Sequence, residues 1–212
     1  MRIYEIASGR KIDMSNEYFD EVRDRIKIEC SDAYRAYQNT KTALYRGVKV
    51  NDGLFSGFFK LFKPKQDLNI YLGKPRENRK PLGSDSYMQR AFDEVFQEKG
   101  FTALRSNSIF CTGSSGMAGD FGRTYIIFPK NGFSFTWSPS VKDLYVETRG
   151  TAITSREYKA NPAVLKQKVE EFVDSRKYSN TNFEEALLSR NEILVNGEFY
   201  ATDYEKHHYF WR

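Results

Sequence analysis

The stretch 105–122, RSNSIFCTGSSGMAGDFG, constrains the fold more than any other part of the chain. Residues 108–111 are apolar and rich in β-favouring side chains, which predicts a strand. Small and hydroxyl-bearing residues follow, and then come Met117, Ala118 and Phe121, whose apolar side chains have helical spacing. We therefore expect a strand, a tight turn and a helix. Backbone N–H groups and hydroxyls at such a turn either hold an anion, orient a carboxylate or serve only as turn chemistry.

The chain has the composition of a single folded domain. Its 212 residues are enough to bury a sizeable core, and 40% of them are hydrophobic and 29% charged. Aromatic residues reach 16%, so we expect aromatic-rich packing with some tyrosines left to line a groove. The sequence has no internal repeat, and we expect one domain over 1–212 whose first 40 residues are mainly helical.

Apolar spacing and turn residues predict the remaining helices and strands. Strands are expected over residues 2–6, 42–50, 123–129, 133–137, 192–195 and 198–203. Helices are expected over residues 15–38, 84–100, 139–146, 162–175 and 183–189. Residues 63–81 are expected to form an exposed loop, and residues 148–161 a loop or an edge strand. This pattern is typical of an α+β fold.

An aromatic face and a basic segment lie between the first two predicted strands of the core. Four phenylalanines of residues 54–62 share one helical face: Phe55, Phe58, Phe59 and Phe62. This face predicts a lid over the core, a membrane-surface helix or a docking site for another chain. Residues 60–80 concentrate basic side chains, which form either a solvated surface or a contact for phosphates.

Several classes of protein do not fit the sequence. No apolar run approaches the roughly 20 residues of a membrane span, and the first residues lack the apolar core of a signal peptide. We therefore expect a cytoplasmic protein without a membrane span. Cys30 and Cys111 match no zinc spacing, so free thiols and no metal site are expected. A nucleophile pair of Cys111 with His207 lacks a recognisable third partner.

Two further motifs carry charged residues next to predicted strands. In LYRG, residues 44–47, Arg46 lies inside a strand, from which its long side chain reaches a phosphate, a carboxylate or solvent. In RNEILV, residues 190–195, Glu192 immediately precedes an apolar strand. Together with the turn at 112–115, these motifs give an arginine, a hydroxyl-rich turn and a glutamate in that order.

This order resembles the ADP-ribosyltransferases of the arginine–serine–glutamate type. That family carries an arginine on an early strand, a Ser-Thr-Ser-like turn followed by an alanine and an aromatic residue, and a glutamate before a strand near the C-terminus. The matching residues here are Arg46, the turn 111–114, Ala118, Phe121 and Glu192. The resemblance covers about residues 42–204. It implies a split β-sandwich with N-terminal and peripheral helices.

The resemblance also implies NAD as a substrate and a role for each matching residue. Cleavage of the nicotinamide–ribose bond builds positive charge on the sugar, and Glu192 would stabilise that charge. Arg46 would bind an NAD phosphate as a planar, always-charged fork. The turn has Cys111 and Gly113 where the family has serine, so either Thr112 or Ser114 would orient Glu192.

Other residues of the motifs would contact the nicotinamide. The backbone of Gly47 could approach the nicotinamide amide closely, because glycine has no Cβ. Phe121 or Tyr125 would stack on the nicotinamide ring, unless both are simply core residues.

The acceptor of the ADP-ribose is suggested by Arg190. Relatives that modify arginine carry a glutamate at this position, and a cation cannot act as the base that activates an arginine acceptor. With a net charge of +5, Arg190 favours an anionic acceptor, with RNA or single-stranded DNA ahead of protein. Arg190 is otherwise a surface cation at the C-terminus of a helix.

Two alternatives stay open at the level of sequence. The same chemistry with water as the acceptor would make the chain an NAD glycohydrolase. A non-catalytic protein of this fold could instead bind nucleic acid or a partner through residues 54–80. Membership of the family would further suggest a toxin, an effector or a phage factor, acting in its own or a host cytoplasm, with a neutralising partner protein.

Overall fold

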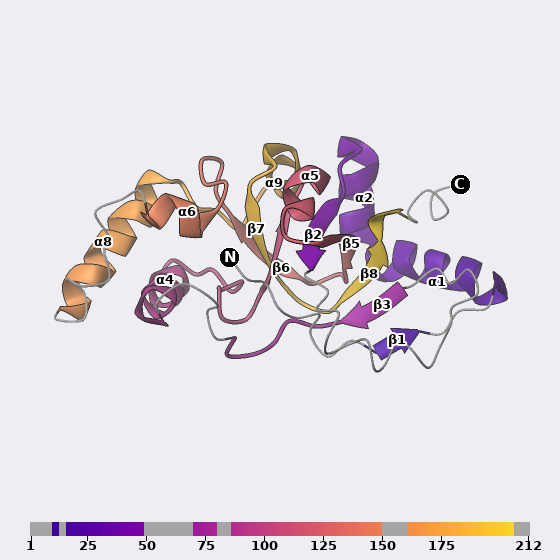
Figure 1. The fold of residues 1–212 in the computed structure, drawn as a ribbon, viewed down its shortest axis with the longest axis horizontal. Helices are drawn as coiled ribbons and strands as arrows, with labels where there is room; N and C mark the ends of the chain where they lie inside the picture. The colour runs from indigo at the N-terminus through magenta and orange to yellow at the C-terminus, as the bar shows by residue number, and fades with distance from the viewer. Residues whose placement is uncertain (1–9, 13–15, 49–69, 80–85, 150–160, 206–212) are drawn as a thin grey trace.

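The computed structural model describes residues 10–12, 16–48, 70–79, 86–149 and 161–205, and the account below concerns these residues. The predicted strand at 2–6, the aromatic face at 54–62, most of the basic segment at 60–80 and His207 lie outside them. Within the described residues the chain is a mixed α+β structure, as the sequence predicts (Figure 1).

A single antiparallel sheet organises the described residues. Its eight strands have the order β1-β3-β8-β5-β2-β4-β7-β6. The strands are β1 (Arg10–Ile12), β2 (Leu44–Val48), β3 (Ile70–Gly73), β4 (Ile109–Thr112), β5 (Arg123–Pro129), β6 (Ser134–Trp137), β7 (Glu192–Asn196) and β8 (Phe199–Asp203). In this part of the chain β2 pairs with β5 along its whole length but with β4 only at Tyr45 and Thr112. The pairing of β2 with β4 is therefore the shortest strand pairing in the described sheet.

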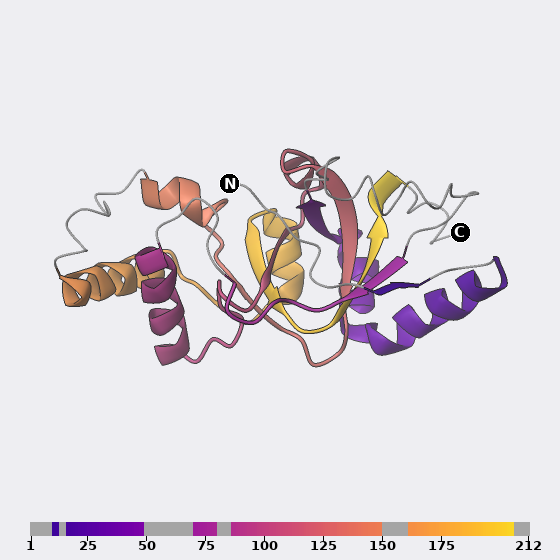
Figure 2. The ribbon, with the colours of Figure 1, turned by 60° about the horizontal axis from the view of Figure 1, so that its bottom comes forward.

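Helices lie on both faces of this sheet. They are α1 (Asn16–Glu29), α2 (Ser31–Thr40), α4 (Ser86–Glu98), α5 (Ser115–Gly119), α6 (Leu144–Arg149), α8 (Pro162–Ser175) and α9 (Phe183–Ser189). Figure 2 shows α4, α6 and α8 together at one end of the molecule and α1 at the other, with the strands between them. None of the described helices has the length and apolarity needed to cross a bilayer.

Three apolar clusters fill the space between the sheet and its helices. Near α4 and α8, Phe92 and Phe172 pack with Phe110 and Leu194 of the sheet. On the same face of the sheet, Ile26 of α1 packs with Phe128 of β5 and Tyr200 of β8. The third cluster lies on the opposite face, where α2 and α9 contribute Ala36, Ala186 and Leu187. Because side chains alternate along a strand, residues of one strand take part in clusters on both faces.

The predicted helix over 15–38 is wrong in one respect, because it is interrupted at Cys30. Cys30 leaves helical geometry with φ −119° and ψ 32°, and its Sγ donates a hydrogen bond to the carbonyl of Phe128 at 3.3 Å. The side chain of Asn131, from the turn between β5 and β6, accepts the N–H of Asp32 at 3.2 Å. A distant residue therefore starts the second helix, α2.

Two further predictions are corrected by the structure. The helix expected over 139–146 begins instead at Leu144, because the carboxylate of Asp143 accepts the N–H groups of Tyr145 and Val146 at 2.8 and 3.3 Å. The loop expected over 63–81 contains strand β3, whose apolar residues pair with β8 on one side and β1 on the other.

Candidate functional site

Glu192 lies at the start of β7 in a buried ion pair with Arg105. Its Oε1 accepts a hydrogen bond from Arg105 Nη1 at 2.9 Å, and the two side chains are only 11% and 8% exposed. The segment that leads into Glu192 is also fixed, because the N–H of Glu192 donates to the carbonyl of Lys142 at 3.1 Å and Asn191 Nδ2 donates to the carbonyl of Ser138 at 2.9 Å. The position of this carboxylate is therefore set by two loops, one before β4 that carries Arg105 and one between β6 and α6.

The charges around Glu192 act in opposite directions on its ionisation. Burial raises the pKa of Glu192, and the negative charge of Asp143 raises it further. The guanidinium groups of Arg105 and Arg79 lower it. Both guanidiniums lie over the ring of Phe110, at 4.7 and 4.4 Å from its centroid. The site is thus a buried carboxylate whose charged form depends on neighbouring arginines.

Thr112 lies directly opposite Glu192 in the pairing of β4 with β7. Its hydroxyl donates to the carbonyl of Arg190 at 2.7 Å and accepts the N–H of Ser114 at 3.2 Å. Ser114 has a different role, because its Oγ accepts the N–H of Met117 at 3.3 Å and so caps the short helix α5. Of the two hydroxyls proposed to orient Glu192, that of Thr112 touches the segment leading into the glutamate.

Arg46 lies on the neighbouring strand but points to the other face of the sheet. Tyr45 pairs with Thr112, which pairs with Glu192, so these three side chains share one face. Arg46, the next residue along β2, is buried on the opposite face. On that face, burial raises the pKa of the Cys111 thiol to about 12, and the positive charge of Arg46 acts in the opposite direction. The strands bring the arginine and glutamate motifs together, and the alternation of side chains separates their charged groups.

Two glycines of the motifs are explained by close packing of helices. A Cβ at Gly47 would lie far inside van der Waals contact of the Ala118 carbonyl oxygen and 2.8 Å from the Cβ of Phe121. A Cβ at Gly113 would collide in the same way with the carbonyl of Leu187 in α9. Helices α5 and α9 therefore require glycine at these positions. The second contact leaves no room for a side chain at position 113, serine included.

The remaining predicted residues lie around this centre. Phe121 is half-buried beside Gly47, whereas Tyr125 is buried on the face of Arg46, with its ring edge-on to that of Tyr71 at 5.9 Å. Arg190 is exposed at the end of α9 in the left-handed region, with φ 61°. Among the described residues, no group of three or more His, Cys, Asp and Glu side chains is placed to hold a metal.

Sequence reasoning missed Arg105, which is the residue in direct contact with Glu192. The residue opens the same stretch as the turn, but nothing in its spacing indicates a partner 87 positions away. The one local signal is that Arg105 lies between two short apolar segments, 103–104 and 109–111, where a buried arginine would need a counter-charge.

Comparison of the chain with protein-family models, curated proteins and solved structures found no match. The chemistry proposed for the site therefore rests on the motif resemblance together with the geometry of its own residues.

Proposed function

We propose that this chain is an NAD-dependent mono-ADP-ribosyltransferase centred on Glu192, on a split β-sandwich. One observation supports this most: β2, β4 and β7 are neighbours in the sheet, although their motifs lie far apart in the sequence. Tyr45, Thr112 and Glu192 consequently form one row across three strands. Strands β2 and β4 pair at a single residue pair, which fits a sheet that splits between these two strands.

The reaction would break the bond between the ribose C1′ and the nicotinamide nitrogen. Nicotinamide leaves with the electron pair of that bond, and positive charge develops on the ribose. The carboxylate of Glu192 stabilises this charge and accepts a hydrogen bond from a ribose hydroxyl. A nucleophile of the acceptor then bonds to C1′ and releases its proton to solvent.

The binding roles are proposed from the resemblance, for residues on both faces of the sheet beside this row, because Arg46 and Tyr125 are buried on the face opposite Glu192. Arg46 is our proposal for a ligand of the NAD phosphates, and the backbone of Gly47 and the ring of Phe121 or Tyr125 for contacts with nicotinamide. Thr112 is favoured over Ser114 as the hydroxyl that supports Glu192, because it bonds to the carbonyl of Arg190.

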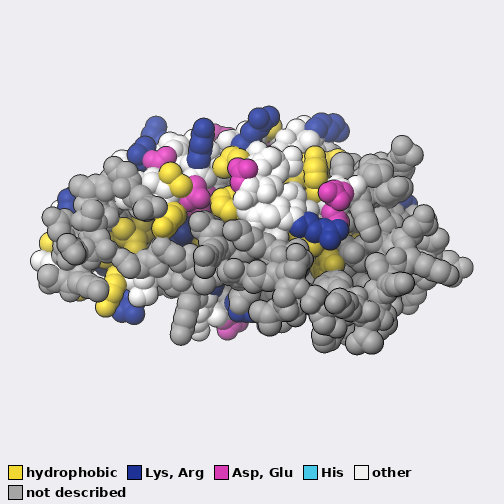
Figure 3. Space-filling view, in the orientation of Figure 1, with side chains coloured by type: hydrophobic (Ala, Val, Ile, Leu, Met, Phe, Trp, Pro, Cys, Tyr) yellow, Lys and Arg dark blue, Asp and Glu magenta, His cyan; other side chains and the backbone are white. Residues whose placement is uncertain are grey.

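An anionic acceptor, RNA or single-stranded DNA ahead of protein, remains part of the proposal. Its support is the exposed Arg190, two residues before Glu192, and the net charge of +5. On the face drawn in Figure 3, the visible Lys and Arg side chains are spread and have acidic side chains among them. The described residues on that face therefore offer no concentrated basic surface, and Arg190 carries the inference.

A second candidate is a non-catalytic binding protein of the same fold. It is favoured by the buried pair of Arg105 with Glu192, because a pair of this kind also serves as a purely structural contact. An NAD glycohydrolase is the third candidate, with water as the acceptor.

One experiment separates these candidates. The purified protein is incubated with NAD labelled in the adenosine part, alone and with separated RNA, single-stranded DNA and protein fractions, and free nicotinamide and transferred label are measured. Transfer to RNA or DNA supports the full proposal, and label found solely on protein rejects the nucleic-acid acceptor. Nicotinamide release in buffer without transfer indicates a glycohydrolase. No release under any condition indicates a binding protein.

A further inference from the structure

The ion pair between Arg105 and Glu192 places a cation directly on the carboxylate that the proposed reaction needs. The contact runs from Arg105 Nη1 to Glu192 Oε1 at 2.9 Å, and both side chains are almost fully buried. Carboxylate hydrogen bonds to an ionised donor are stronger than neutral ones, and the planar guanidinium also fixes the direction of the contact. The pair therefore has the geometry to set both the charge and the orientation of Glu192.

Arg105 is itself held firmly. Its N–H donates to Asp93 Oδ1 of α4 at 2.8 Å, and its guanidinium lies 4.7 Å from the ring centroid of Phe110 on β4. Asn107 closes the loop around it, because Asn107 Oδ1 accepts the N–H of Leu104 at 2.7 Å. The cation that meets Glu192 is thus fixed by a helix, a strand and its own loop.

The other charged and titratable groups near Glu192 do not replace Arg105. Asp143 adds negative charge and so favours the protonated carboxyl, as burial does. Tyr178 has a pKa raised by burial, so its hydroxyl stays neutral at ordinary pH. Arg79 also lowers the pKa of Glu192, but less than Arg105 does, and Arg105 forms a direct ion pair with the carboxylate.

We propose that Arg105 is a positioning residue that keeps Glu192 ionised and turned toward the reacting ribose. The inference rests on the proposed transferase function. The ion pair uses Oε1, and Oε2 is the oxygen proposed to meet the ribose hydroxyl. A protonated or rotated Glu192 could not stabilise the developing positive charge, so losing the Arg105 cation weakens catalysis without removing any group that touches NAD.

The test is the pH dependence of nicotinamide release from NAD by the full chain. Activity requires ionised Glu192, so it falls as pH drops through the pKa of that residue. Without the cation the pKa rises, and the acid limb of the profile moves to higher pH. In Arg105→Gln we expect a move of about 1–3 pH units, the range typical of losing one close opposite charge. Arg105→Lys keeps a positive charge but loses the planar guanidinium, so its acid limb should move in the same direction by a smaller amount. Its kcat should lie between those of Arg105→Gln and the wild-type protein.

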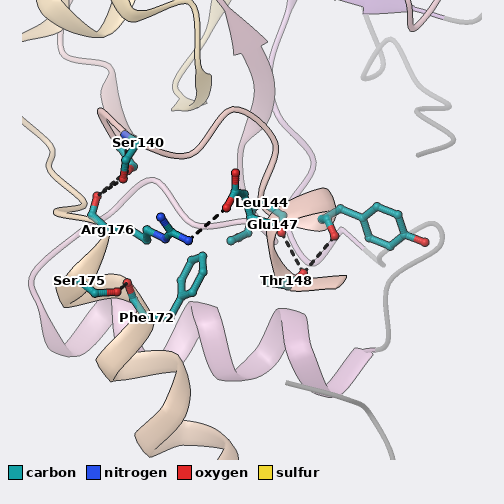
Figure 4. Close-up of polar contacts among 9 residues, drawn as sticks. Ser140, Leu144, Glu147, Thr148, Phe172, Ser175 and Arg176 are labelled. Carbon is teal, nitrogen blue, oxygen red and sulfur yellow. Dashed lines mark hydrogen bonds and ion pairs between the residues drawn. The ribbon is translucent and has the colours of Figure 1, made fainter. Parts of the chain in front are cut away.

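A matched control comes from a second arginine that also pairs with a glutamate above a phenylalanine ring. Arg176 Nη2 lies 3.3 Å from Glu147 Oε2, and its guanidinium lies 5.4 Å from the centroid of Phe172. Figure 4 shows these three side chains together. Arg176→Gln removes an ion pair of the same composition without touching Glu192. We expect its acid limb to coincide with that of the wild-type protein.

The outcomes separate this inference from the function on which it rests. If the wild-type protein releases no nicotinamide, the transferase proposal fails and the role of Arg105 falls with it. If the wild-type protein is active and the acid limb of neither Arg105 variant moves, Arg105 is a structural residue and only this inference fails. Faster release by Arg105→Gln would also overturn it, because the pair would then restrain Glu192. Should Arg105→Gln not fold by circular dichroism, the direction of the Arg105→Lys shift decides.

Discussion

Thr112 and Arg190 are joined by a 2.7 Å hydrogen bond from the threonine hydroxyl to the arginine carbonyl. The bond ties the turn after β4 to the segment that enters β7, two residues before Glu192. Thr112 also pairs with Glu192 across the two strands. A hydroxyl of the turn therefore supports the backbone that carries the glutamate, and its effect on the carboxylate is indirect.

Thr112→Val should weaken both the fold and the activity. The exchange keeps the shape of the side chain but leaves the carbonyl of Arg190 without this donor, which costs about 1–3 kcal/mol when the group is buried. Urea unfolding measures the stability, and nicotinamide release at a temperature where the variant is folded measures the activity, for which we expect about a tenfold loss.

Thr136→Val is the matched control for this exchange. Thr136 is a fully buried threonine on β6 whose hydroxyl has no hydrogen-bond partner among the described residues. Removing an unsatisfied buried hydroxyl is neutral or stabilising. Equal losses of stability in the two variants would show that the bond to Arg190 contributes nothing specific.

Gly113→Ala should destabilise the chain because α9 lies against this residue. The added Cβ would overlap the backbone carbonyl of Leu187, which cannot rotate away as a side chain could. We expect a loss of at least 1–3 kcal/mol, on the order of that seen for overpacking. Gly116→Ala in the neighbouring helix α5 is the comparison, because a Cβ there meets its nearest atom at 3.9 Å. Alanine should be neutral or raise stability by about 0.5–1 kcal/mol in that helix, and a similar loss in both variants would contradict the packing account.

Arg46→Lys tests whether the buried arginine is a phosphate ligand or a core residue. Lysine keeps the charge but loses the planar fork, so NAD should bind about tenfold more weakly in calorimetry while the protein stays folded. The comparison is Arg123→Lys on β5, whose arginine pairs with Asp203 and is not proposed to touch NAD. Unchanged NAD affinity in Arg46→Lys would assign Arg46 to the core of the face that it shares with Cys111.

Both cysteines should be inert in the folded protein. Burial raises the pKa of Cys30 and of Cys111 to about 12, so at pH 8 only about one thiol in ten thousand is ionised at each site. Ellman's reagent should therefore react with neither thiol in native protein and with both after unfolding in guanidinium chloride. Rapid reaction of Cys111 at pH 8 would contradict its buried position and reopen a nucleophilic role.

The elements that the sequence predicts well are those whose signals are local. β5 and β8 have apolar runs bounded by turn residues, and α8 has a proline at its start with an asparagine cap, so neighbouring residues are sufficient to define them. The failures involve distant partners. The break between α1 and α2 depends on Asn131, about 100 positions away, and β3 becomes a strand by pairing with β8.

In the candidate site, too, contacts with distant partners are the ones that the sequence does not predict. The resemblance implies that the hydroxyl of Thr112 or Ser114 lies near Glu192, and the strand of Thr112 does pair with that of Glu192. The partner of Glu192 could not be predicted, because Arg105 reaches it through a loop whose path is fixed by Asp93 and Asn107. The face to which Arg46 points follows from strand register, which a single sequence does not define.

Glu192→Gln is the most direct test of the central claim. The exchange keeps the size of the side chain and removes the negative charge that the cationic transition state needs. We predict that nicotinamide release from NAD falls at least a hundredfold, in line with the roughly 2.7–4 kcal/mol typical of losing one electrostatic stabiliser, while circular dichroism shows a folded protein. Glu198→Gln is the control. Glu198 is a half-exposed residue just beyond the end of β7 and forms an ion pair with Lys130, so this variant should release nicotinamide at the wild-type rate. A wild-type rate in Glu192→Gln itself would contradict the account.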